Sequence, residues 1–485
     1  MILYAVGMEA VSCPGCVQRD AVIAELSRRI AVLEAQVRDL LARLGQNASN
    51  SSLPPSANPP DAPKPVVKKP TGRKSGGQAG HEPHLRQRLA GAQVSRVVRF
   101  IPKKCRCCQA ALPDQAGVND PEPSWHQVVE LPPLVAEVTE YQGHTRTCRK
   151  CGAETHAAIP AELRRHVTGP RLAAFLAYLR GAHQVSQRGL EEIVETALEV
   201  PLSLGTIGRL EEQTSAALAS AHVEALQAVR QAPVKNVDET GWKRAGGWLW
   251  LAATRTVAAF VIHAQRGADG LKALLGETIV GILCTDRWSA YHGVPLEQRQ
   301  VCWAHLKRDF QKCVDRGGAS VKIGRAGLRI VSELFACWHR HRDGPGDVDE
   351  LGEAMAPLSR RLQRVLRAGQ RCADGKTATL CANLLACWPA LWLFIFGNEV
   401  EPTNNHAERM LRRGVLWRKR SFGSHSAEGC RFAERMLTVV QTLRLQKRSV
   451  LRYLHEAIVA HRAGAPAPKL LAMGASNISG GDGRG

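Results

Sequence analysis

The chain has 485 residues and an ordinary hydrophobic content of 44%, which gives room for about three or four globular domains. Its 65 Lys and Arg against 44 Asp and Glu give a formal charge of +21, which favours nucleic acid as a partner because released counterions drive binding to phosphates. The 15 scattered cysteines argue for a reducing compartment. No apolar run is long enough to span a membrane, and residues 1–7 lack the basic start of a signal peptide. We therefore expect a cytoplasmic protein without a membrane partner.

The first predicted element is a coiled-coil helix over residues 13–45. An apolar heptad seam follows alternating spacings of three and four, through Ile23, Leu26, Ile30, Leu33, Val37, Leu40 and Leu44. This pattern predicts a homodimer or higher oligomer, and the alternative is a single helix packed on its own domain. Cys13 and Cys16 have zinc-ligand spacing, but no second pair is near them, so their role stays open.

Residues 46–85 form a basic, flexible linker, because Asn, Ser, Pro, Lys and Gly leave almost nothing apolar to bury. The second half can lie along phosphates or enter a minor groove, and we assign such contacts to Arg73 and Lys74. A solvated segment without contacts is the alternative.

A zinc-ribbon-like module is predicted for residues 95–160. Two Cys-x-x-Cys pairs, Cys105 with Cys108 and Cys148 with Cys151, predict a structural Zn²⁺ held by four thiolates. Cys107, which lies between Cys105 and Cys108, is not assigned as a ligand. The 39 residues between the pairs contain strand-like runs at 125–131 and 134–141, which suggest a hairpin. Unmetallated thiols are the alternative.

Residues 163–230 read as helices, with a helix–turn–helix pattern formed by 189–198, a turn, and 204–213. Ser203 is placed to cap the second of these helices. A DNA-recognition helix is one interpretation. A plain helical bundle is the other, because acidic residues on both helices would repel phosphates: Glu191, Glu192, Glu211 and Glu212.

The region 233–425 alternates strand-like and helix-like runs and predicts an α/β domain with a mixed sheet, in a multidomain α/β protein. Strands are expected around Asp238 and at 248–255, 257–264, 279–285 and 300–303. A helical insertion of about 320–398 interrupts the domain. Two helices follow within 426–462, and we expect the Gly- and Pro-rich tail 463–485 to be disordered.

Three carboxylates are the candidate catalytic residues. Asp238 and Asp286 lie on or at the end of strand-like runs, and Glu408 opens a helix-like run. Their oxygens suit two Mg²⁺ or Mn²⁺ ions, which can activate and stabilise the oxygens of a phosphodiester reaction. Each has a structural alternative: both aspartates could end strands, and Glu408 could form a capping box with Asn405 or an ion pair with Arg412.

Basic residues near these carboxylates in sequence are candidates for phosphate contacts, which position DNA without reading its sequence: Lys307, Arg308, Arg409, Arg412 and Arg413. Cys302 and His305 offer two soft ligands without a completing pair. A local packing role near the carboxylates is therefore favoured over a second zinc site.

Several motifs together resemble bacterial transposases of the insertion sequence 66 family, a branch of the DDE transposases. They are Val237-Asp238-Glu239-Thr240, Thr285-Asp286-Arg287-Trp288-Ser289-Ala290-Tyr291, Cys302-Trp303-Ala304-His305-Leu306-Lys307-Arg308-Asp309-Phe310 and Asn404-Asn405-His406-Ala407-Glu408-Arg409, joined by Gly76-Gly77-Gln78-Ala79-Gly80-His81. The resemblance implies a ribonuclease-H-like catalytic fold with Asp238, Asp286 and Glu408 as the metal-binding triad. His406 departs from the family pattern, which usually has a basic residue there.

The resemblance leads us to expect a nucleoid-associated DNA transposase. It would bind the terminal inverted repeats of an insertion sequence, cut the DNA and transfer the strand to a target, assisted in some relatives by small accessory proteins. A catalytically silent DNA-binding regulator derived from a transposase is the competing class. A nuclease of the same fold that does not join strands is a second enzymatic alternative.

Overall fold

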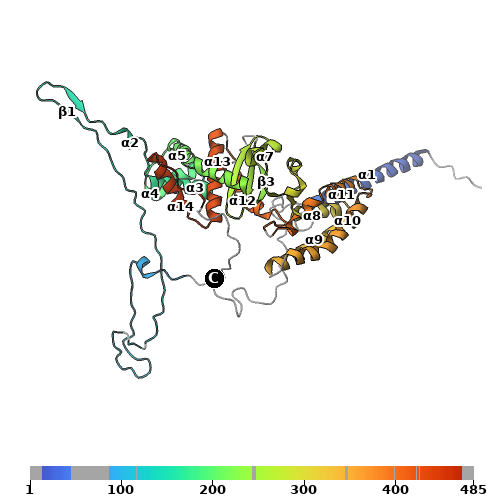
Figure 1. Ribbon diagram of the computed structural model, residues 1–485, viewed down its shortest axis with the longest axis horizontal. Helices are drawn as coiled ribbons and strands as arrows, with labels where there is room; N and C mark the ends of the chain where they lie inside the picture. The colour runs from blue at the N-terminus through green and yellow to red at the C-terminus, as the bar shows by residue number, and fades with distance from the viewer. Residues whose placement is uncertain are drawn as a thin grey trace, which may run out of the picture. The chain divides into compact units, whose positions relative to one another are not determined.

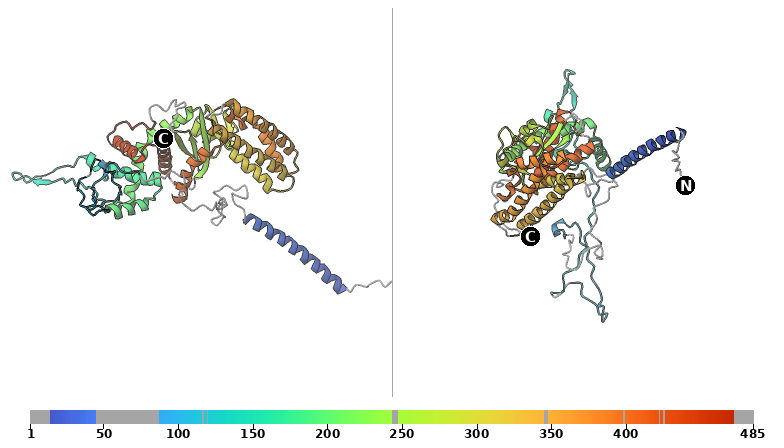
Figure 2. Two further views of the ribbon diagram at one scale, coloured as in Figure 1. Left: turned by 90° about the horizontal axis from the view of Figure 1, so that it is seen from below. Right: turned by 90° about the vertical axis from the view of Figure 1, so that its right-hand side faces the viewer.

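The computed structural model describes residues 14–44, 87–115, 117–118, 120–242, 247–344, 348–397, 399–421, 423–424 and 426–471 (Figures 1 and 2). The chain divides into a larger unit, Met1–Ala62, Thr139–Thr196 and Val200–Gly485, and a smaller one, Pro63–Val138 and Ala197–Glu199. The basic linker, with Arg73 and Lys74, lies outside the described residues, as does Cys13.

A five-stranded mixed sheet with the order β5-β4-β3-β6-β7 forms the centre of the larger unit. The first three strands are an antiparallel meander, and the last two continue the sheet in parallel. The strands are β3 (Val234–Trp242), β4 (Gly247–Ala253), β5 (Ala258–His263), β6 (Ile282–Thr285) and β7 (Arg299–Val301). The predicted mixed sheet is therefore confirmed.

Helices cover both faces of the sheet, which explains why Leu249–Ala253 of β4 is buried throughout. A Cβ on Gly414 of α12 (Asn405–Ser421) would lie 2.3 Å from Leu249, and one on Gly270 of α7 (Ala268–Leu275) would lie 2.3 Å from Trp250. Successive strand residues point to opposite faces. The helices α12 and α7 therefore pack on opposite faces of β4 (Figure 1).

The helices of the 163–230 region belong to the larger unit together with the sheet, apart from the last two residues of α4. They pack with the C-terminal helices α13 (Ala427–Leu445) and α14 (Val450–Arg462), and α13 also packs on β5. Ser203 caps α5 as predicted, its hydroxyl accepting from the Thr206 N–H at 3.3 Å. The bounds are α2 (Ala161–Arg164), α3 (Pro170–His183), α4 (Gln187–Leu198), α5 (Leu204–Ala217) and α6 (Ala219–Gln231).

The predicted helical insertion is a bundle beside β6 and β7 (Figure 2). Its apolar core joins Trp303 and Phe310 of α8 (Trp303–Asp315) to helices α9 (Ser320–Asp343), α10 (Val348–Gly369) and α11 (Gly375–Ala386). Asp374 caps α11 by accepting from the Thr377 N–H. Short 3-10 turns complete the region: η3 (Ser289–Tyr291), η4 (Leu296–Gln298), η5 (Pro389–Leu391) and η6 (Leu393–Ile395).

The prediction of hairpin strands in the cysteine module is wrong in their position. Residues 125–131 and 134–141 have no ladder partner in the described structure, and their apolar side chains, such as Val128 and Val135, are exposed. Ladder bonds form instead beside a cysteine turn, where β1 (Thr145–Thr147) pairs with β2 (Glu154–His156). A single bridge joins Lys104 to Ala111 around the other turn, and η2 (Gly91–Gln93) precedes it. Strand-like alternation forms no sheet where no partner edge is available.

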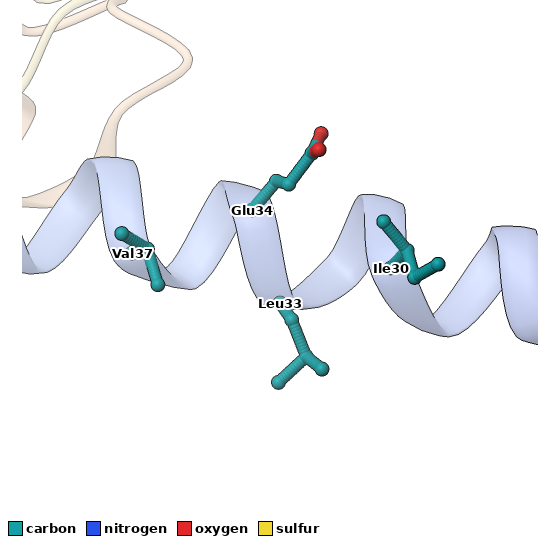
Figure 3. A pocket seen from close by; sticks show the side chains of 4 residues that line it. All are labelled: Ile30, Leu33, Glu34 and Val37. Atoms are coloured by element: carbon teal, nitrogen blue, oxygen red, sulfur yellow. The ribbon is translucent and has the colours of Figure 1, made fainter.

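The predicted helix is confirmed as α1 (Pro14–Leu44). The alternative, a helix whose seam packs on its own domain, is not seen in the described residues. The five described seam residues are all more than half exposed: Ile23, Leu26, Ile30, Leu33 and Val37. Figure 3 shows Ile30, Leu33 and Val37 projecting from the helix together with Glu34. The seam is an apolar stripe that is not covered by the described part of this chain.

The first part of the tail, 463–471, is ordered by contacts rather than disordered as predicted. Leu470 is fully buried, and its N–H donates to the Glu224 carboxylate at 3.0 Å. Tyr453 donates its hydroxyl to the Pro468 carbonyl at 2.8 Å. The rest of the tail lies outside the described residues. The part of the chain that the structure describes contains no helix with the length and apolar character of a membrane span.

Candidate active site

The register of the sheet places two of the three candidate carboxylates side by side. Asp238 lies opposite Leu251, so it shares the face of Leu249 that α12 covers. Asn236 is in register with Cys284 on the parallel strand β6. Continuing both strands by two residues brings Asp286, just beyond β6, level with Asp238 on the same face.

The third carboxylate, Glu408, reaches this face from the first turn of α12. A buried side chain, Asn404, fixes where that helix starts. Its amide donates to the Val237 carbonyl at 2.7 Å and accepts from the Asn236 side chain at 3.0 Å. The Asn404 N–H donates to the Cys302 sulfur at 3.1 Å. The start of α12 is thus bonded to the strand that carries Asp238.

The three carboxylates act on each other electrostatically. The pKa of Asp238 is raised well above its usual value, first by burial and then by the charges of Glu239, Asp286 and Glu408. The Glu239 N–H, which donates to Asp238 at 2.9 Å, opposes that shift. A divalent cation would relieve this repulsion. Among the described residues, however, no three His, Cys, Asp or Glu side chains are gathered closely enough to hold a metal ion.

Two basic side chains stand beside Glu408. His305 Nδ1 lies 3.7 Å and an Arg308 nitrogen 3.6 Å from the same carboxylate oxygen. Burial lowers the pKa of His305, and its buried Nδ1 has no hydrogen-bond partner in the described structure. Both residues lie on α8, so the helix that precedes the predicted insertion also contributes to this site.

Cys302 takes the local packing role that its sequence favoured. It is buried, and burial raises the pKa of its thiol to about 11. Its sulfur accepts the Asn404 N–H, so Cys302 is part of the packing that fixes the start of α12. This explains the Cys302–His305 spacing without a second metal.

The structural alternatives proposed for Glu408 do not hold. Helix α12 begins at Asn405, so its cap position is Asn404 and Glu408 is one residue too late for a capping box. The Asn404 side chain is bonded to β3 and not to the helix. In the described residues the salt bridge of Glu408 is with Arg308 of α8, and Arg412 makes none with it.

A second buried carboxylate, Glu239, lies on the opposite face of β3 and was not identified from the sequence. It receives the Tyr291 hydroxyl at 2.5 Å and an ion pair from Arg266 at 2.9 Å. Burial nevertheless raises the pKa of Glu239. The alternation of strand residues already places Glu239 away from Asp238, but only the fold shows its partners, which come from later segments of the chain.

Comparison with known proteins identifies the family. The Transposase IS66 family matches residues 165–432, which is more than half of the chain and contains all three carboxylates. The chain belongs to the IS66 family of transposases. A family of unknown function matches residues 17–87, which include most of α1.

Two relatives of this IS66-family chain come from Sinorhizobium fredii (strain NBRC 101917 / NGR234), and both are uncharacterized proteins. The protein y4hP is 24% identical over 417 residues, which cover 77% of this chain and 73% of that protein. The protein y4qI is 23% identical over 257 residues, which cover 48% of this chain and 47% of that protein. The chain therefore spans about half the length of y4qI.

The basic residues of this IS66-family chain divide into two groups. Lys307, Arg409, Arg412 and Arg413 are exposed, and Arg308 is half-buried beside Glu408. Two other arginines of α12 are used inside the fold. Arg418 donates to Thr240 and Gly241 of β3, and Arg420 donates to the His183 carbonyl.

The two cysteine pairs, taken separately, form the same kind of turn. The Cys105 N–H donates to the Ala110 carbonyl and the Cys148 N–H to the Ala153 carbonyl, both at 2.8 Å. The fourth residue after each cysteine is left-handed, Gln109 at φ 62° and Gly152 at φ 73°. Hydrogen bonds, first from the main chain two and three residues on, lower the pKa of both Cys105 and Cys148. This favours the thiolate form.

Proposed function

We propose that this chain is a DNA transposase that cuts and joins DNA ends at a site formed by Asp238, Asp286 and Glu408. The observation that supports it most is the register of β3 with β6, which aligns the two aspartates on the face covered by α12. Membership of the IS66 family supplies the reaction class. The competing assignments, a silent DNA-binding regulator and a nuclease that cannot join strands, have no observation in their favour.

We also propose that the catalytic domain is ribonuclease-H-like. Three antiparallel strands extended by two parallel ones, with carboxylates on neighbouring strands β3 and β6, support that assignment. The helical bundle between β7 and α12 is then an insertion that separates Asp286 from Glu408 in sequence.

The donor set fits Mg²⁺ or Mn²⁺, because it offers carboxylate oxygens, and of the two nitrogens beside Glu408 in the described residues that of His305 can bind a metal whereas that of the Arg308 guanidinium cannot. Asp238, Asp286 and Glu408 would hold the ions. Two bound ions would supply activation of the attacking oxygen and stabilisation of the leaving one. Burial and then the charges of the neighbouring carboxylates raise the pKa of Asp238, and bound cations would relieve the repulsion between these carboxylates.

The protein's own groups position the reaction. The bonds of Asn404 to β3 hold the Glu408 helix in register with Asp238. Arg308 lies where its charge can meet a phosphate that approaches Glu408. The exposed cations Lys307, Arg409 and Arg412 are proposed to contact flanking phosphates without reading sequence.

The remaining modules are proposed to recognise and pair the DNA ends. Terminal inverted repeats would be read by the cysteine module and by α4 and α5. The matching turns at Cys105–Cys108 and Cys148–Cys151 support one structural Zn²⁺. The exposed seam of α1 supports a coiled-coil homodimer, which would bring two ends together, and accessory proteins could join that complex.

The test uses purified protein, Mg²⁺ or Mn²⁺, and duplexes carrying the inverted repeats that flank the gene. Wild type should cut the ends, and should join a pre-cut 3′-hydroxyl end to target DNA. Asp238→Asn and Glu408→Gln should each lose both activities by about 10³-fold or more, because the ligand set acts as a unit. Glu428→Gln, an exposed carboxylate at the start of α13, is the matched control.

Three results would contradict the proposal. Specific end binding by wild type without any cleavage in Mg²⁺ or Mn²⁺ would indicate the silent regulator. Cleavage without strand transfer from a pre-cut end would indicate the nuclease. A Glu408→Gln protein with wild-type rates would remove Glu408 from the site.

A further inference from the structure

An exposed tryptophan lies next to the candidate active site. Trp288 follows Asp286 by two residues and is 38% exposed, although tryptophan is usually well buried. The main-chain N–H of Trp288 donates to the Asp286 carboxylate at 2.8 Å. Two residues span at most about 7 Å, so Trp288 is within roughly two nucleotide steps of a phosphate held at Asp286.

The indole of Trp288 is held rigidly. The Arg266 guanidinium lies 3.8 Å from the centre of the Trp288 ring and 4.6 Å from that of Trp248, so it is shared by two tryptophans. The indole N–H donates to the Arg266 carbonyl at 3.3 Å. Glu239 holds the guanidinium through an ion pair of 2.9 Å, and its other carboxylate oxygen accepts the Tyr291 hydroxyl at 2.5 Å. One ring face is therefore covered by Arg266, and the exposed part of the ring is pre-organised.

The position of the stack relative to the sheet restricts what can bind there. Trp248 and Trp250 are two residues apart in β4, so both lie on the face of the sheet that α7 covers. Asp238 lies on the other face, which α12 covers. Trp288 thus connects the end of β6, where Asp286 lies, to the other side of the sheet. A base paired inside a duplex at the carboxylates cannot also stack on this ring, but a base turned out of the duplex can.

We propose that Trp288 is a stacking site for one unpaired nucleobase of the DNA strand held at Asp286. The inference rests on the proposed transposase function and adds a positioning site to it. A base stacked on the indole would fix the strand beside the carboxylates, and the cation behind the ring strengthens such stacking. Stacking needs only the π-face of a base, so the site accepts any of the four bases.

The test measures binding rather than chemistry. A single-stranded 12-nucleotide DNA with one 2-aminopurine, and the same sequence as a blunt duplex, are titrated with full-length protein in buffer that contains no Mg²⁺, Mn²⁺ or chelator. Trp288→Ala should weaken single-strand binding by about 5- to 150-fold, the equivalent of one lost base–aromatic stack, and should abolish the quenching of 2-aminopurine. Duplex affinity should change less than twofold, and Trp288→Phe should keep most of the single-strand affinity.

Phe396→Ala, which removes an exposed aromatic ring of the insertion, is the matched control and should bind like wild type. Equal melting temperatures for Trp288→Ala and wild type would show that the fold is intact. The proposal is overturned if wild type neither prefers the single strand nor quenches 2-aminopurine, or if Trp288→Ala binds the single strand normally. Absence of Mg²⁺-dependent cleavage with intact quenching would instead count against the transposase function alone.

Discussion

The hydrogen bonds of Asn404 offer a direct test of how Glu408 is positioned. Asn404→Ala removes two side-chain bonds, to Val237 and Asn236, while the main-chain bond to Cys302 can persist. Each bond contributes about 1 kcal/mol net, and leaving the Val237 carbonyl unpaired beside α12 costs about 1–3 kcal/mol more. We expect a loss of about 3–5 kcal/mol in the free energy of unfolding of the sheet-containing unit.

Asn404→Asp separates hydrogen bonding from the loss of volume. The aspartate variant is the same size and can still accept from Asn236, but a carboxylate cannot donate to Val237. It should therefore destabilise the protein at neutral pH at least as much as Asn404→Ala. The neighbouring Asn405→Ala, at an exposed position, should change stability by less than about 0.5 kcal/mol.

Urea unfolding followed by tryptophan fluorescence is a suitable assay, because Trp250 and Trp417 are buried against the sheet. The expected loss corresponds to a fall of about 1 M in the urea midpoint. Both Asn404 variants should also cut DNA more slowly at temperatures where they remain folded, since Glu408 would lose its register. If Asn404→Asp and Asn405→Ala unfold at the same midpoint, this account of the helix start is wrong.

Three further predictions concern other parts of the chain. Cys148→Ser should lose about one tightly bound zinc per chain by metal analysis, whereas Cys107→Ser should keep it; zinc-free wild type would exclude the site. In sedimentation, Leu33→Lys should weaken self-association by placing charge in the seam, while Val32→Lys, equally exposed but off the seam, should not; the same oligomer for both would exclude this interface. Burial raises the pKa of Glu434 to about 7, above its usual 4.5, so wild-type stability should fall by up to about 3 kcal/mol as pH rises from 4.5 through 7. Glu434→Gln, which keeps the acceptor for the Ile262 N–H, should lack that fall in urea titrations across this pH range.

The sequence alone predicted the features whose signals are local. Heptad spacing predicts a helix wherever it occurs, and α1 is one. Continuous apolar runs predicted the strands β4 and β5 to within two residues at each end, because a sheet covered on both faces excludes polar side chains from those positions. The Cys-x-x-Cys spacing predicted paired thiols, and each pair forms a turn that favours its thiolate. These patterns need only neighbours in the chain.

Long-range pairing decided the rest. Nothing local distinguishes residues 125–131 from a strand, but a strand exists only where a partner edge is available, and none is paired with it in the described structure. The ordered start of the tail depends on Glu224, more than 200 residues earlier in the chain. The same applies to the faces of Asp238 and Glu239, adjacent carboxylates whose surroundings differ because α12 covers one side of the sheet and α7 the other.

The candidate site combines both kinds of information. Motif residues identified Asp238, Asp286 and Glu408 as candidates, yet each had a structural alternative that the sequence left open. The register of β3 with β6 and the bonds of Asn404 brought the three together, through contacts that span 167 residues between Asn404 and Val237. A sequence records which side chains are available for such a site, but their distance and burial arise only when strands and helices from distant segments pack, because those quantities depend on the whole folded chain.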